Sequence, residues 1–137
     1  MKILSVLLAL CWIGWAHASA PAEGASGPKV EYIPLSPPFV ANFGASATNA
    51  RLSYVKADIA VRTSTPAATE AVKYHMPYLR NELVMLLSSQ DMETMTTNEG
   101  KEKLRAEALA KVQAVLQQEE GAPLVEDLLF SSFVIQR

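Results

Sequence analysis

The chain has 137 residues, of which 50% are hydrophobic, and a formal net charge of −2. These values suit one compact domain, and they argue against non-specific binding to nucleic acid, which needs a strongly basic surface. The whole sequence holds a single cysteine, Cys11, so the chain cannot form an internal disulfide.

The N-terminus has the layout of a secretory signal. A positive charge precedes an almost wholly apolar run over residues 3–15, and Ala16 and Ala18 form a small-x-small cleavage site. The apolar run is shorter than the roughly 20 residues that span a bilayer. We therefore expect a signal peptide at residues 1–18, cut after Ala18. The alternative is an uncleaved segment that associates with the membrane through residues 3–18.

Composition then separates a linker from a folded domain. Residues 19–31 are rich in Pro, Ala, Gly and Ser, which predicts a flexible linker ahead of a domain at residues 32–137. Three prolines between residues 34 and 38 exclude a central strand there. A short strand is expected over Phe39–Phe43.

The clearest strand runs from Arg51 to Thr63. Apolar and polar residues alternate along it, which is typical of a half-buried strand in an antiparallel sheet. The expected apolar face consists of Val55, Ala57, Ile59 and Val61, and the expected wet face consists of Tyr54, Lys56, Asp58 and Arg62.

A first helix is expected to begin at Thr65, because Pro66 is well tolerated at the first helical position. An apolar stripe at steps of three and four consists of Ala68, Val72, Met76, Leu79, Leu83 and Leu86. Pro77 interrupts the stripe, and a proline inside a helix costs about 3 kcal/mol against alanine. Because the stripe keeps its phase across Pro77, we predict one long helix with a kink at this proline.

The end of this helix is apolar at every position. The segment consists of Leu83, Val84, Met85, Leu86 and Leu87. One interpretation is a helix end that is buried beneath the sheet, and the other is an interface with another subunit. The sequence leaves both interpretations open.

A second helix is expected to begin with a capping box, in which Thr96 is the cap and Glu99 reaches back to it. Its apolar stripe consists of Leu104, Ala108, Val112, Val115 and Leu116. Glu107 and Lys111 are expected to form an ion pair on the opposite face. Gly121, followed by proline two residues later, predicts the end of the helix.

A final strand is expected over Val125–Gln136. The alternation places Phe130 and Val134 on one face and Leu129, Phe133 and Ile135 on the other. Such a strand is either central in the sheet, or covered by a helix on one side and by a partner on the other. The element order strand, strand, helix, helix, strand predicts an α+β domain with a small antiparallel sheet and two helices on one face.

No catalytic, cofactor-binding or metal-binding motif accompanies these elements. His75 is the one histidine beyond the signal segment, whereas a zinc site takes three or four ligands and a catalytic base needs a partner. We expect His75 to lie half-buried beside the kink and to bond a carbonyl that Pro77 leaves free. The sequence therefore predicts no enzyme, no cofactor and no metal site.

Five segments together resemble the FliL family of flagellar basal body-associated proteins. In chain order they are Pro38–Phe43, Arg51–Val55, His75–Arg80 with the Leu86–Ser89 segment, Glu99–Leu104 and Phe133–Gln136. The resemblance covers about Tyr32 to Arg137, and the order of the segments makes it specific although no single motif is decisive.

The resemblance implies a periplasmic domain of the stomatin/prohibitin (SPFH) type at the flagellar basal body, in the periplasm or on the periplasmic side of the inner membrane. It implies a non-catalytic role, with the stator proteins of the motor as partners, a ring of copies of the chain itself, and support of swimming, swarming and chemotaxis. The family usually begins with a basic tail and a full transmembrane helix, whereas this chain begins with a signal-like segment. The alternative is a diverged paralogue, a soluble periplasmic scaffold or ligand-binding protein with the same fold and no role in motility.

Overall fold

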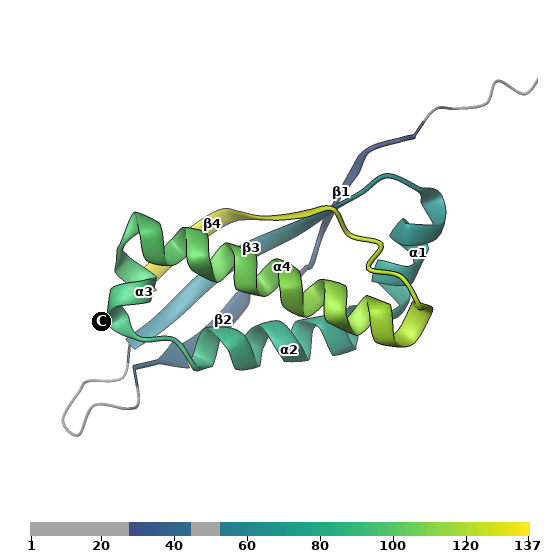
Figure 1. Cartoon of the computed structure of the whole chain (residues 1–137). Helices are drawn as coiled ribbons and strands as arrows, with labels where there is room; N and C mark the ends of the chain where they lie inside the picture. Colours follow the sequence, from purple (N-terminus) through teal and green to yellow (C-terminus); the bar gives the residue numbers. More distant parts are fainter. Residues whose placement is uncertain (1–27, 45–52) are drawn as a thin grey trace, which may run out of the picture.

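The computed structural model describes residues 28–44 and 53–137, in which a four-stranded antiparallel sheet carries helices on one face (Figure 1). The expected signal peptide with Ala16 and Ala18, and most of the expected linker, lie outside the described residues. The α+β class and the small antiparallel sheet are confirmed. The described residues form four helices instead of the two that were expected.

The sheet is built around β3 (Ser53–Thr63), the longest strand. On one edge of β3, β2 (Phe39–Phe43) pairs with its first half and β1 (Glu31–Pro34) pairs with its last residues. β4 (Asp127–Gln136) pairs with β3 over nearly its full length and occupies the other edge. The short strands β1 and β2 therefore follow one another along one border of the sheet, and β4 forms the opposite border.

The alternation read from β3 is confirmed. Val55, Ala57, Ile59 and Val61 are all at most 3% exposed and face the helices. On the opposite face, which we call the outer face, apolar residues of several strands remain in contact with solvent. They include Tyr32, Val40, Tyr54 and Val134, each at least 40% exposed.

β4 is not central, which was one of the two positions expected for it, and its expected faces are wrong. The register shifts between Asp58 and Ile59 of β3, because Ser131 is an additional residue in β4. Such a β-bulge reverses the phase of the alternation beyond it. Phe130 and Phe133 therefore share the face that is covered by helix, with ring centroids 5.1 Å apart.

The expected single kinked helix is also wrong. The chain forms α1 (Pro66–Tyr74) and α2 (Met76–Ser88), separated by His75, whose φ of −89° and ψ of 9° depart from helical geometry. Pro77 then lies in the first turn of α2, where its missing amide hydrogen costs little because first-turn amides have no partner within the helix. The start at Thr65 is confirmed, and its side chain accepts a hydrogen bond from the Ala68 amide.

A short helix, α3 (Met92–Thr96), precedes α4 (Asn98–Glu120) and was not expected. It changes the capping of α4, because Thr96 ends α3. The side chain of Thr97 caps α4 instead, accepting a bond of 3.0 Å from the Gly100 amide. A side chain at residue 100 would meet the main chain of Thr94 at 2.5 Å, so only glycine permits this close approach.

The core lies between the inner face of the sheet and the helices α2 and α4, which cross it side by side (Figure 1). The stripe of α4 is confirmed, since Leu104, Ala108, Val112, Val115 and Leu116 are all at most 5% exposed. Gly121, with a φ of 77°, ends α4 as expected. Burying each large apolar side chain contributes roughly 1.5–3 kcal/mol before the loss of conformational entropy.

Candidate interaction surface

The turn between α1 and α2 is joined to the C-terminal end of α4. His75 Nε2 lies 2.6 Å from the carboxylate of Glu120, and the ring of Tyr74 meets the imidazole edge-on. The side chain of His75 is 12% exposed and that of Glu120 is 38% exposed. His75 is thus half-buried as expected, but its recorded partner is a carboxylate and not a backbone carbonyl. The pair between His75 and Glu120 therefore holds the turn between α1 and α2 against α4.

Arg80, which the sequence analysis did not single out, joins α2 to the proline-rich segment between β1 and β2. Its guanidinium donates to the carbonyls of Leu35 and Pro37 and lies 4.1 Å from the centroid of the Phe39 ring. We call this arrangement the Arg80 clamp. The peptide bond between Ser36 and Pro37 within the clamped segment is cis. The sequence feature that could have indicated the Arg80 clamp is the proline-rich segment, because prolines interrupt strand pairing and leave carbonyls without partners in a sheet.

The apolar end of α2 divides between core and surface. Leu83 and Leu87 are at most 1% exposed, and Val84 and Leu86 are partly buried against the core. Met85, in contrast, is 63% exposed. Of the five residues proposed as an interface, Met85 is therefore the one that is freely available to a partner, and Leu86 borders the groove described next.

A shallow groove of about 420 Å³ lies on the outside of the helical layer. It is lined by Leu86 of α2 and by Glu107, Ala110, Lys111 and Ala114 of α4. Lys111 pairs across it with Glu82 of α2 at 3.7 Å, so the expected pair with Glu107 is replaced by a bond between two helices. We call the groove together with Met85 the α2–α4 surface. Its small, mostly apolar lining suits contact with another protein.

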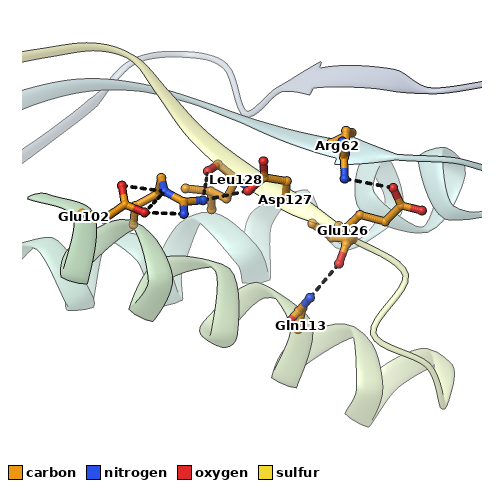
Figure 2. A network of polar contacts seen from close by, with 8 residues as sticks. Arg62, Glu102, Gln113, Glu126, Asp127 and Leu128 are labelled. Carbon is orange, nitrogen blue, oxygen red and sulfur yellow. Dashed lines mark hydrogen bonds and ion pairs between the residues drawn. The ribbon is translucent and has the colours of Figure 1, made fainter.

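A second arginine, Arg105, joins α4 to the beginning of β4, and its partners Glu102, Asp127 and Leu128 are labelled in Figure 2. It contacts the Glu102 carboxylate on its own helix, the Asp127 carboxylate at 2.7 Å and the Leu128 carbonyl at 3.1 Å. We call this arrangement the Arg105 clamp. Nearby, Gln113 donates to the Val125 carbonyl at 2.8 Å.

The Arg105 clamp changes the ionisation of its members. The hydrogen bond from Arg105 lowers the pKa of Glu102, and the same bond raises the pKa of Arg105. Both shifts favour the charged forms that hold the clamp together. At the start of α3, the hydrogen bond from the Thr94 amide lowers the pKa of Asp91 in the same sense.

Within residues 28–44 and 53–137, no group of three or more His, Cys, Asp or Glu side chains could hold a metal ion. Across the same residues, none of the helices has the length and apolarity needed to cross a membrane. His75 is paired with Glu120, and among the described residues no nucleophilic side chain is within hydrogen-bond distance of its ring.

Comparison with known proteins finds similarity over most of the chain. The family model of the flagellar basal body-associated protein FliL matches residues 32–136. A flagellar protein FliL of Aquifex aeolicus (strain VF5) is 28% identical over 102 residues, which are 74% of this chain. The aligned part is 59% of that relative, so the chain spans less than two thirds of its length. The family model covers most of the chain, and the chain belongs to the FliL family of flagellar basal body-associated proteins.

Proposed function

We propose that this protein is a non-catalytic component of the flagellar basal body, in the periplasm or on the periplasmic side of the inner membrane. In this role it contacts the stator proteins of the motor and further copies of itself, and it supports swimming, swarming and chemotaxis. The observation that carries the proposal is the family match over residues 32–136, which takes in every helix and strand of the described residues except the first residue of β1. The antiparallel sheet with helices on one face is compatible with a stomatin/prohibitin (SPFH)-like domain.

The α2–α4 surface is the region that we assign to the contact with the motor. The exposed Met85 directly precedes Leu86 of the groove, whose lining is mainly apolar, and Lys111 and Glu82 pair between the two helices at 3.7 Å. An apolar side chain beside a rigid groove is typical of a protein-binding site, because binding buries it at little cost in conformational entropy. The position of Met85 outside the core means that it can be changed without loss of the fold.

The role is tested by deleting the gene and measuring swimming and swarming on soft agar, with co-purification of the stator proteins. Restoring the chain should restore motility. Met85→Lys should restore it poorly and should weaken the co-purification. The matched control is Ala67→Lys, which adds the same charge to an exposed position of α1.

Two results would contradict the proposal. Normal swimming and swarming without the protein, together with no recovered stator protein, would favour a periplasmic scaffold or ligand-binding protein without a motility role. Equal behaviour of the Met85→Lys and Ala67→Lys chains would leave the motor role standing but would remove the α2–α4 surface from it.

A further inference from the structure

β4 presents an unpaired edge at the border of the sheet. Of the strands in residues 28–44 and 53–137, β3 alone pairs with it, so its second edge points away from the sheet (Figure 1). An edge of this kind is a template for pairing with another strand. At its beginning, both main-chain groups of Leu128 are bonded to side chains. Its amide donates to Asp127, and its carbonyl accepts from Arg105.

The sequence of β4 and its flanks reads nearly the same in both directions. About a centre between Ser131 and Ser132, equivalent positions hold similar or complementary residues. The pairs are Phe130 with Phe133, Leu129 with Val134, Leu128 with Ile135, Asp127 with Gln136, and Glu126 with Arg137. When two identical strands run antiparallel about a two-fold axis, each of these residues meets its counterpart on the other copy.

We propose that β4 pairs with β4 of a second copy of this chain about a two-fold axis between Ser131 and Ser132, so that one sheet runs continuously through the two copies. The contact is isologous and therefore closes as a dimer. It differs in symmetry from the head-to-tail contacts that build a ring, and it does not depend on any role in the motor.

The bulge at Ser131 is what makes the two halves of β4 compatible. Opposite residues in an antiparallel pair must lie on the same face of the sheet. In a regular strand, Phe130 and Phe133 would lie on opposite faces, and the two-fold pairing would bring unlike faces together. Because Ser131 is inserted, Phe130 and Phe133 both lie on the inner face, whereas Leu129 and Val134 both lie on the outer face. The register with β3 thus places every one of the matched pairs on a common face.

The charges at the ends of β4 favour the same register. Glu126 and Arg137 are both exposed. Within one copy the Glu126 carboxylate lies 3.4 Å from Arg62, and the two-fold pairing brings the Arg137 guanidinium of the other copy to this same carboxylate at both ends. On the outer face, Leu129 would cover Val134 of the second copy, a side chain that is 46% exposed in a single chain. Opposite-charge pairs and branched apolar pairs both stabilise strand pairing.

The Arg105 clamp is compatible with this pairing. A carbonyl oxygen has two lone pairs, so the Leu128 carbonyl can accept from Arg105 and from an amide of the second copy together. The Leu128 amide must exchange the Asp127 carboxylate for a carbonyl of Ile135 on the other copy. In a single chain, Arg105 and Asp127 therefore bond the main chain of Leu128 at the free edge. Formation of the dimer breaks one hydrogen bond per copy, the bond between the Leu128 amide and the Asp127 carboxylate.

Disulfide cross-linking tests the register directly. In a chain that carries Cys11→Ala, the double change Leu129→Cys with Val134→Cys sets each new thiol opposite its counterpart on the second copy. Within one copy the two positions are five residues, or about 16 Å, apart and cannot form a bond. Mild oxidation of the purified protein should yield a covalent dimer on a non-reducing gel.

The two single variants are the matched controls. Leu129→Cys alone and Val134→Cys alone place equal residues about 16 Å apart across the axis, so neither should cross-link. Absence of a covalent dimer from the folded double variant, or equal dimer from a single variant, would overturn the proposal. Loss of motility is not a readout here, so failure of this test is distinct from failure of the motor role.

Charge reversal supplies a second measurement that leaves the strand itself unchanged. Arg137→Glu places like charges at both ends of the pairing and should raise the dimer Kd in sedimentation equilibrium by about 3- to 10-fold. Adding Glu126→Lys to Arg137→Glu removes the pair with Arg62 within each copy but restores opposite charges across the axis, so it should return the Kd towards that of the unchanged chain. A Kd that is unaffected by Arg137→Glu, or the absence of any dimer at high protein concentration, would argue against the pairing.

Discussion

Two arginines from the helical layer hold the two borders of the sheet, and they do so in different ways. Arg80 of α2 reaches the β1–β2 border and contacts carbonyls and an aromatic ring. Arg105 of α4 reaches the β4 border and contacts two carboxylates as well as a carbonyl. The Arg80 clamp satisfies backbone that cannot pair within the sheet, whereas the Arg105 clamp covers backbone that can still pair with another chain. The first is therefore part of the fold, and the second protects an edge.

Removing the Arg80 clamp should have the largest effect. Arg80→Ala deletes two charged-donor hydrogen bonds and the contact with Phe39, and we expect a loss of about 2–3 kcal/mol in the free energy of unfolding. The measurement is urea unfolding followed by circular dichroism. Arg80→Lys should lose part of this amount, because an ammonium group cannot lie flat over the ring and reach both carbonyls.

Removing the Arg105 clamp should cost less. Arg105→Ala breaks bonds that are partly exposed to solvent, so we expect a loss of about 1–2 kcal/mol in the same unfolding experiment. The change also frees the Leu128 carbonyl, and the self-association measured by sedimentation should not fall. A loss as large as that of Arg80→Ala would remove the distinction between the two clamps.

Pro77, at the beginning of α2, provides a third test of what stabilises this side of the fold. Because it lies in the first turn of α2, Pro77→Ala removes no hydrogen bond and restores a little freedom to the unfolded chain. We expect a loss of no more than about 1 kcal/mol, and an unchanged far-ultraviolet spectrum. A loss of about 3 kcal/mol would mean that the proline fixes the turn at His75 directly.

The smallest expected effect is a difference in acid sensitivity between the two clamps. The folded pKa of Glu102 is lowered by Arg105, so its contribution to stability is present above the ordinary value of 4.5 and is lost as the pH falls through the folded pKa. Glu102→Gln should therefore reduce the stability at neutral pH slightly and should not reduce it at strongly acid pH. Unfolding curves between pH 7 and pH 3 measure this difference. An equal effect of Glu102→Gln at both ends of the range would contradict it.

Local pattern was enough to predict much of this fold. Three features were predicted correctly: the alternation in β3, the stripe of α4, and the caps at Thr65 and Gly121. Each depends on residues that are close together in the sequence. The position of α3 could not be predicted, since a five-residue helix has too few turns to show a period. The capping residue of α4 was missed by one position for the same reason.

The sequence by itself determined the alternation in β3, the helical stripes and the family, and with them the α+β class. Only the tertiary structure decided that the first helical region divides at His75, that Ser131 is inserted in β4, and that β4 lies at a border. These three features depend on which strand pairs with which and on contacts between residues far apart in the chain. The arginine clamps are of the same kind, because Arg80 and Arg105 find their carbonyl partners only after the helices have packed on the sheet.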